Sequence, residues 1–269
     1  MEKNEYALIT GASMGLGRSF ALELASRGYN LLLVSLPNEK LDEVAQECRS
    51  KGVECTTYEF DLTNRERRME FVDEVNSSFE ISILINNVGI GGSREFVSTK
   101  VEYIETMLSL NIVVMTTLVH QFLPNLMRQK RGYILNISSM ISLVPTGFKT
   151  TYPSSKAYIR HFSSGLREEL RGSNTSVTTV ILGPMPTKED VIRRIEAQGF
   201  MGRIITLSTE EVARKSIDSL FSRRGERIIG KYNQLLSMLL AVIPMKVKTF
   251  YMTRTVKKNE INESIGDRR

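Results

Sequence analysis

The sequence predicts an α/β fold, a single doubly wound domain in which helices cover both faces of a parallel sheet of about seven strands. Short apolar runs typical of buried strands alternate with amphipathic stretches of helical length as far as residue 230. A glycine-rich turn joins the first of these strands to the first helix, and polar residues follow most of the later strands. Strands and helices that alternate in this way form parallel sheets.

The individual elements follow from apolar periodicity and from glycine and polar breaks. The predicted strands are 6–10, 30–35, 53–60, 81–85, 132–139, 176–182 and 227–229. The predicted helices are 19–27, 38–50, 64–78, 101–128 and 152–171. Beyond residue 230, an apolar and basic stretch predicts a helical extension at 231–256, and we expect the polar tail 257–269 to be frayed.

The composition favours a globular domain over a membrane-spanning or metal-binding protein. The hydrophobic fraction of 41% and the charged fraction of 25% are those of a globular domain, and no run approaches the roughly 18 apolar residues of a membrane span. Cys48 and Cys55 have no cysteine or histidine partners at metal-binding spacing, so we expect no metal site. The N-terminus lacks the pattern of a secretory signal, which favours a cytoplasmic location.

The net charge of +6 is not gathered into one basic helix interleaved with aromatic residues. We therefore expect no nucleic-acid partner. Part of the excess lies near the C-terminus, where seven Lys and Arg stand against three Asp and Glu from residue 246 onward.

The turn at 11–17 reads Gly-Ala-Ser-Met-Gly-Leu-Gly and lies between a predicted strand and a predicted helix. Glycines allow a tight turn and a close approach of the backbone to a ligand, and the free N–H groups of a helix N-terminus favour an anion. This context predicts a site for the pyrophosphate of a dinucleotide.

Tyr152 and Lys156 lie four residues apart at the start of a predicted helix, which places both side chains on one face. The cation would then lower the pKa of the phenol and make it a usable acid. The pair alone does not distinguish this from a surface Tyr and Lys, because 9 Tyr and 14 Lys make a chance match about even.

Polar clusters follow the strands at 10–17, 61, 86–89, 138–139 and 183–187. Ligands of doubly wound sheets bind outside the carboxyl ends of the strands. One pocket can therefore collect all of these residues.

Taken together, these motifs resemble the short-chain dehydrogenase/reductase family, a Rossmann-type fold, over nearly the whole chain to about residue 230. Residues Thr10 to Gly17 resemble its Thr-Gly-x-x-x-Gly-x-Gly turn, and Asn86-Asn-Val-Gly89 resembles its Asn-Asn-Ala-Gly motif. Gly183-Pro-Met-Pro-Thr187 is similar to its Pro-Gly-x-x-x-Thr segment, with Leu182 in place of the first proline.

The resemblance implies a catalytic tetrad of Asn111, Ser139, Tyr152 and Lys156. Tyr152 would exchange a proton with the substrate oxygen, and Ser139 would hydrogen-bond to the same oxygen. Lys156 would lower the pKa of Tyr152 and hold the nicotinamide ribose, and Asn111 would position a water as a proton relay. Ser138 replaces Ser139 if the strand shifts by one residue.

It also implies a cofactor site. Asp61 would contact the adenine, and Asn86 with Gly89 would line the adenosine ribose. The full predicted set is Thr10, Gly11, Ser13, Met14, Gly15, Leu16, Gly17, Ser35, Asp61, Leu62, Asn87, Gly89, Tyr152, Lys156, Gly183, Pro184, Met185 and Thr187.

The end of the second strand, residues 35–38, holds neither an acidic nor a basic residue. Without a carboxylate nothing there repels the 2′-phosphate, so we favour NADP(H) over NAD(H). Side chains that can bind the phosphate are Ser35, Asn38, Lys40 and Arg18.

For the substrate end, the resemblance implies a lid at about 185–205 that belongs to the domain 1–230. Residues 145–149 would form a second wall, with Phe148 inside. The extension 231–256 resembles that of reductases acting on ketones and acyl chains. Such an apolar helix with a basic flank can lie on an anionic membrane, but we favour a cover over the substrate pocket or a dimer partner.

The predicted function is therefore an NAD(P)-dependent oxidoreductase acting on an alcohol or carbonyl, in particular an NADPH-dependent reductase of an apolar ketone such as a 3-oxoacyl or steroid-like compound. The alternatives are a catalytically idle nicotinamide sensor or assembly subunit, and an epimerase or dehydratase. The family resemblance implies a homodimer or homotetramer.

Overall fold

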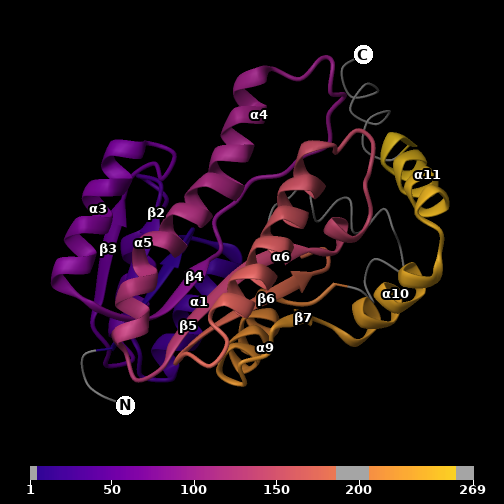
Figure 1. The fold of residues 1–269 in the computed structure, drawn as a ribbon. Coiled ribbons are helices and arrows are strands. Elements are labelled where there is room, and N and C mark those ends of the chain that lie inside the picture. Colours follow the sequence, from indigo (N-terminus) through magenta and orange to yellow (C-terminus); the bar gives the residue numbers. More distant parts are fainter. Residues whose placement is uncertain (1–4, 186–205, 259–269) are drawn as a thin grey trace.

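The computed structural model describes residues 5–185 and 206–258. Its centre is a seven-stranded parallel sheet of order β3-β2-β1-β4-β5-β6-β7 (Figure 1). The strands are β1 Glu5–Thr10, β2 Asn30–Ser35, β3 Cys55–Glu59, β4 Glu80–Asn86, β5 Gly132–Ser139, β6 Thr175–Leu182 and β7 Glu226–Ile228.

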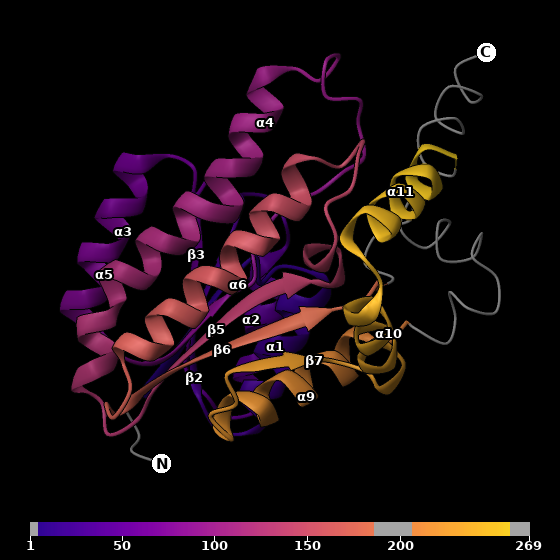
Figure 2. The same cartoon turned by 45° about the vertical axis from the view of Figure 1, so that its right-hand side comes forward.

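Helices cover both faces of this sheet (Figures 1 and 2). They are α1 Gly15–Ser26, α2 Leu41–Arg49, α3 Arg65–Ser78, α4 Val101–Leu108, α5 Met115–Arg128, α6 Thr151–Glu169, α9 Thr209–Phe221, α10 Lys231–Val242 and α11 Met245–Val256. The described residues also form two short turns, the π-helix η1 Ser109–Val114 and the 3-10 helix η2 Met140–Leu143.

Each face of the sheet has its own apolar core. In β1, Ala7 and Ile9 pack in the core with α1, α2 and α9, whereas Leu8 between them packs in the core with α3, α5 and α6. Neighbouring side chains of a strand point to opposite faces, so a strand buried on both sides is apolar throughout. This confirms the predicted doubly wound arrangement.

The order of strands reverses beside β1, because the chain first moves from β1 to β2 and β3 and then returns to β4 on the other side. A crevice opens at such a reversal, outside the carboxyl ends of the strands. The loops after β1, β4 and β5 therefore meet there, and we call this place the crevice.

Each predicted strand and helix is present, with ends that differ by a few residues. Two features were not anticipated: α9, and the π-helical turn η1 that interrupts the helix predicted at 101–128. By length and composition alone, that helix, Val101–Arg128, can also cross a membrane. Its residues Leu118, Phe122 and Leu126 pack on the sheet, however, as in the core helix of a globular domain.

The helices α10 and α11, which we call the C-terminal helix pair, lie beyond β7 at the carboxyl end of the sheet (Figure 2). The extension predicted at 231–256 is thus helical, with a break at Ile243 and Pro244.

Candidate active site

The turn after β1 requires glycine because of its backbone conformation and its close packing against the rest of the chain. Gly11 and Gly15 have φ values of +67° and +54°, in the left-handed region that favours glycine. A Cβ on Gly17 would lie 1.9 Å from the carbonyl oxygen of Gly11. The start of α1 therefore packs directly against the turn.

The N-terminus of α1 fits an anionic ligand. Its N-cap residue, Met14, makes no side-chain cap, and the first turn holds no acidic residue. The N–H groups that begin a helix then lack partners from cap side chains, and the helix dipole favours negative charge. This end of the helix suits the pyrophosphate of a dinucleotide. Within the turn, Met14 is exposed, whereas Ser13 and Leu16 are buried.

Asn87 ties the loop after β4 to the glycine turn. Its amide donates to the carbonyls of Thr10 and Gly11 at 3.0 and 3.1 Å. The Thr10 hydroxyl in turn accepts from the backbone N–H groups of Asn87 and Val88. Two of the predicted motifs are thus joined by direct hydrogen bonds.

Asn86 has a different place from the one expected. Its side chain is buried and donates to Asn136 at 2.8 Å, and Asn136 donates to Ser163 at 2.9 Å. The expectation that Asn86 lines the ribose is wrong for this structure, because the strand alternation turns its side chain into the sheet layer.

Ser139, not Ser138, faces Tyr152. Ser138 is buried, and its hydroxyl donates to the backbone carbonyl of Lys156 at 2.8 Å. Ser139 ends β5, and its side chain hydrogen-bonds with that of the half-buried Tyr152. The structure therefore favours Ser139 over Ser138 as the serine at the candidate site.

The electrostatics of the pair Tyr152 and Lys156 differ from the expectation. Burial raises the pKa of Tyr152, and the hydrogen bond with Ser139 opposes this. Lys156 is only 6% exposed, its Nζ donates to the carbonyl of Ile137 at 3.0 Å, and burial lowers its pKa to about 8. The ammonium lies 5.9 Å from the centre of the Tyr152 ring. The net shift in the pKa of Tyr152 is thus upward, because burial outweighs the groups that lower it, and a lowering by the Lys156 ammonium stays a prediction.

Asn111 lies in the π-helical turn η1 and is 1% exposed. Its amide donates to the carbonyl of Ile90 at 2.9 Å and to Ser155 at 3.0 Å, and its Oδ1 accepts from the N–H of Ile90. Such turns are rare and often occur at functional sites. Here the turn fixes the loop after β4, and the relay through a water stays a prediction.

That loop lies directly over Tyr152 and Lys156. A Cβ on Gly89 would be 2.8 Å from Oδ1 of Asn111, and one on Gly91 would be 2.8 Å from the Tyr152 ring. Glycine at both positions lets the backbone approach Tyr152 and Lys156 closely.

The remaining predicted cofactor residues lie around the crevice. Ser35 is buried and donates to its neighbour Leu36. Asp61 is exposed and accepts from the N–H and the hydroxyl of Thr63, and Leu62 beside it is buried. The predicted residues that follow β6 are Gly183, Pro184 and Met185. Thr187 and the predicted lid beyond Met185 lie outside the described residues.

The sequence did not reveal a role for Glu39. Its carboxylate accepts a hydrogen bond from Ser13 of the glycine turn at 2.7 Å. Two predicted phosphate ligands already have acidic partners, since Arg18 pairs with Glu47 at 2.6 Å and Lys40 with Glu43 at 3.4 Å. The loop after β2 therefore brings negative charge to the adenosine side of the crevice.

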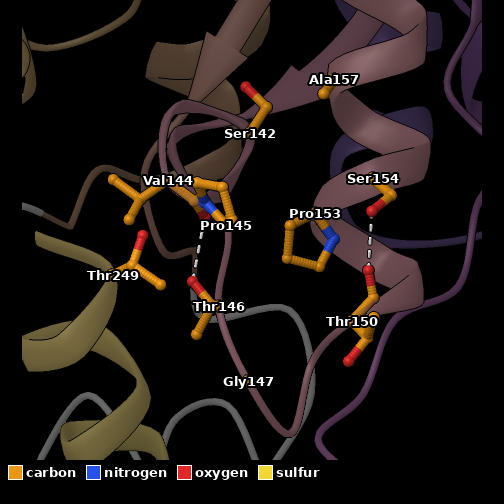
Figure 3. Close-up of a pocket in the computed structure, with 10 residues that line it drawn as sticks. All are labelled: Ser142, Val144, Pro145, Thr146, Gly147, Thr150, Pro153, Ser154, Ala157 and Thr249. Carbon is orange, nitrogen blue, oxygen red and sulfur yellow. Dashed lines mark hydrogen bonds between the residues drawn. The ribbon is translucent and has the colours of Figure 1, made fainter. Parts of the chain in front are cut away.

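Two pockets adjoin the start of α6. The larger, of about 350 Å³, lies between the loop after β5, α6 and α11 (Figure 3). Its lining includes Val144, Pro145 and Pro153, with Thr249 from α11. The smaller, of about 20 Å³, is the one that Tyr152 lines, together with Phe148. The loop predicted as a substrate wall thus divides its residues between the two, and we assign neither pocket to the substrate on volume alone.

Metal binding has no support in the described ranges. Within residues 5–185 and 206–258, no group of three His, Cys, Asp or Glu side chains is placed to hold a metal ion.

The chain matches known proteins over most of its length. A family model for short chain dehydrogenases matches residues 5–197. A very-long-chain 3-oxoacyl-CoA reductase of Coccidioides immitis (strain RS) is 36% identical over 184 residues, which cover 66% of this chain and 53% of that protein. The chain thus spans little more than half the length of that relative.

Solved structures agree with the fold. A 7β-hydroxysteroid dehydrogenase superposes with a TM-score of 0.85 at 25% identity, over 93% of this chain and 98% of that one. A short-chain dehydrogenase from Sphingobium yanoikuyae, solved in complex with NADPH, superposes with a TM-score of 0.75 at 26% identity. The superposition covers 89% of this chain and 96% of that one. From the family match and these likenesses, the chain belongs to the short-chain dehydrogenase family.

Proposed function

We propose that this protein is an oxidoreductase that interconverts an alcohol and a carbonyl with a nicotinamide cofactor, and that it acts as a reductase of an apolar ketone. The observation that supports this most is the contact between Ser139 and Tyr152 beside the buried Lys156. The cofactor supplies the hydride when bound. Thr10, the glycine turn and Asn87 would hold it.

Tyr152 would act as the acid. Its raised pKa keeps the phenol protonated at neutral pH, which suits the donation of a proton to a carbonyl oxygen that becomes a hydroxyl. Ser139 would donate a hydrogen bond to the same oxygen as charge develops on it. Lys156, with a pKa of about 8, gains and loses a proton close to neutral pH and is suited to restore the proton of Tyr152.

For the substrate, we propose a bulky apolar ketone of the 3-oxoacyl or steroid-like class. The names of two similar proteins, a very-long-chain 3-oxoacyl-CoA reductase and a 7β-hydroxysteroid dehydrogenase, support this class. Val144 and Pro145 would offer apolar surface to such a substrate.

For the cofactor, the contact between Ser13 and Glu39 argues for NAD(H). The preference for NADP(H) depended on the lack of a carboxylate near the end of β2, and Glu39 supplies one. A carboxylate there accepts a 2′-hydroxyl and repels a 2′-phosphate. We therefore propose NAD(H) as the preferred cofactor.

Replacing Tyr152 by Phe tests the proposed chemistry. Loss of the proton donor should lower turnover of a panel of apolar ketones by about 10²- to 10⁴-fold, while binding of NADH persists. Nicotinamide absorbance measures turnover, and cofactor fluorescence measures binding.

The matched control is Tyr158→Phe, an exposed tyrosine on the same helix, which should leave turnover unchanged. Equal turnover of wild type and Tyr152→Phe would contradict the catalytic assignment. Cofactor binding without turnover of any ketone would favour the idle sensor, and product formation without a net change in absorbance would favour the epimerase or dehydratase.

A further inference from the structure

The C-terminal helix pair exposes more large apolar side chains than all the rest of the described chain. Twenty large apolar side chains are exposed in the described part of the chain, and eleven of them lie between Tyr232 and Tyr251. Met238 is 66% exposed and Val242 80%. Exposed apolar side chains that gather in one place mark an interaction surface, whereas scattered ones do not.

The polarity of α10 is inverted relative to an ordinary surface helix. Its one buried residue is Asn233, which donates to the carbonyl of Ile229 at 2.9 Å. Gln234 donates to the carbonyl of Ile228 at 2.8 Å. Polar side chains thus attach the helix to the domain, and its leucines point away. A surface helix normally turns its apolar stripe toward the core, so the apolar face of α10 is built for something outside the domain.

The same segment carries the whole net charge of the protein. Residues 231–258 contain no Asp or Glu and six Lys or Arg, namely Lys231, Lys246, Lys248, Arg254, Lys257 and Lys258. Subtracting these six from the 36 Lys and Arg leaves 30, which equals the 30 Asp and Glu of the chain. Apolar and cationic residues are therefore concentrated together, on a body that is otherwise electrically balanced.

The combination of apolar and cationic residues indicates what kind of partner binds this surface. A second copy docked face to face would bring the cationic segments of two copies together, which like-charge repulsion opposes. An anionic lipid surface instead attracts the cations and takes up the apolar side chains. The aromatic residues Tyr232, Phe250 and Tyr251, all exposed, are of the kind that favours the membrane interface.

We propose that the C-terminal helix pair docks this protein on the surface of an anionic lipid membrane. Its inner side is joined to the catalytic domain, since Thr253 accepts from the N–H of Gly147 at 2.9 Å and Thr249 lines the 350 Å³ cavity. If the proposed function holds, an apolar ketone dissolved in the bilayer then passes along α11 into the pocket beside α6, with little exposure to water.

The test uses the full chain and vesicles of phosphatidylcholine, with or without phosphatidylserine, in a sedimentation assay. We expect wild type to bind the vesicles that contain phosphatidylserine, more weakly as salt rises. Replacing both Lys231 and Lys246 by Gln should weaken binding about 25-fold, at about fivefold per lysine. Replacing both Met238 and Val242 by Gln should also weaken it, at any salt concentration.

Matched controls change the same residue types elsewhere. Lys51→Gln and Met127→Gln alter an exposed lysine before β3 and an exposed methionine at the end of α5, both at the amino end of the sheet, and both should bind as wild type does. The proposal is overturned if wild type binds neither kind of vesicle, or if the controls weaken binding as much as the test variants.

The proposal is also overturned if wild type does not bind vesicles and is a dimer by light scattering, while the variant with both Met238 and Val242 replaced is a monomer. The partner of the apolar surface is then a second copy of the chain. Turnover of the ketone panel in the same variants separates this inference from the proposed function. Failure of vesicle binding with intact turnover contradicts the docking alone.

Discussion

At the crevice, the buried side chains are polar and bond to other protein groups, whereas at the C-terminal helix pair the exposed side chains are apolar and contact little of the protein. Asn111 and Lys156 are almost fully buried and each bonds to a backbone carbonyl. Leu235 and Met238 are more than half exposed. Asn111 and Lys156 thus bond within the protein, whereas the helix pair leaves its apolar surface for another partner. The two regions should respond to mutation in opposite ways.

The largest expected effect is at the glycine turn. Gly17→Ala places a methyl group 1.9 Å from the carbonyl of Gly11, so the turn must open. We expect a loss of about 3 kcal/mol in the free energy of unfolding and the loss of NADH binding. Urea denaturation and fluorescence titration measure the two.

Gly165→Ala is the matched control, because this helical glycine in α6 has open space around the added methyl. It should stabilise the protein by about 0.5–1 kcal/mol. Similar losses in both variants would show that the turn is not as tightly packed as described.

A pH-dependent effect of comparable size is expected at Lys156. Its folded pKa of about 8 lies below the unfolded value of about 10.4, so the unfolded state holds more protons between the two. Burial of the charge therefore destabilises the wild type fully below pH 8, and this penalty fades as pH rises.

Lys156→Met removes the penalty. Its free energy of unfolding relative to wild type should fall by on the order of 3 kcal/mol between about pH 7 and about pH 10. Urea denaturation at both pH values measures this, with the exposed Lys51→Met as the control. A difference that does not change with pH would contradict the buried ammonium.

A smaller effect is expected at Glu39. Glu39→Gln keeps a hydrogen-bond acceptor for Ser13 and removes the charge, so the affinity for NADPH relative to NADH should rise about tenfold, or about 1.4 kcal/mol. Competitive titration of the two cofactors measures the ratio. Glu102→Gln on α4 serves as the control, and an unchanged ratio in Glu39→Gln would restore the case for NADP(H).

The smallest effect is expected on the outer face of α10. Leu239→Ala should change the free energy of unfolding by less than about 0.5 kcal/mol, because the side chain is 53% exposed. The matched Leu126→Ala, at a leucine of α5 with no exposure, should destabilise by about 2–5 kcal/mol. A large loss in Leu239→Ala would mean that this face is covered within the protein.

The two regions also differ in how much of them could be predicted from the sequence. Strand and helix periods, with glycines at fixed positions, were enough to place Tyr152 and Lys156 at the crevice, because the topology brings all carboxyl ends of parallel strands together. The choice of Ser139 over Ser138 and of Asn87 over Asn86 depends on which face a strand end turns, which a shift of one residue reverses.

Other features lie beyond periodicity. The contact between Glu39 and Ser13 depends on the path of a loop, and the raised pKa of Tyr152 depends on how deeply it is buried. The apolar run of α10 was expected to cover a pocket or a partner, and the sequence could not show that its apolar face is exposed. Apolar residues at helical spacing predict a face that avoids water, without naming what covers it.

The π-helical turn at residues 109–114 has a consequence for insertions and deletions. A π-turn corresponds to one residue more than an α-helix needs, and the helices α4 and α5 on either side continue through it. Deleting one residue there would leave an unbroken helix in which α5 keeps its face on the sheet, while Asn111 loses its position over the loop at Ile90. A single-codon deletion could therefore turn this enzyme-like site into a folded but idle one.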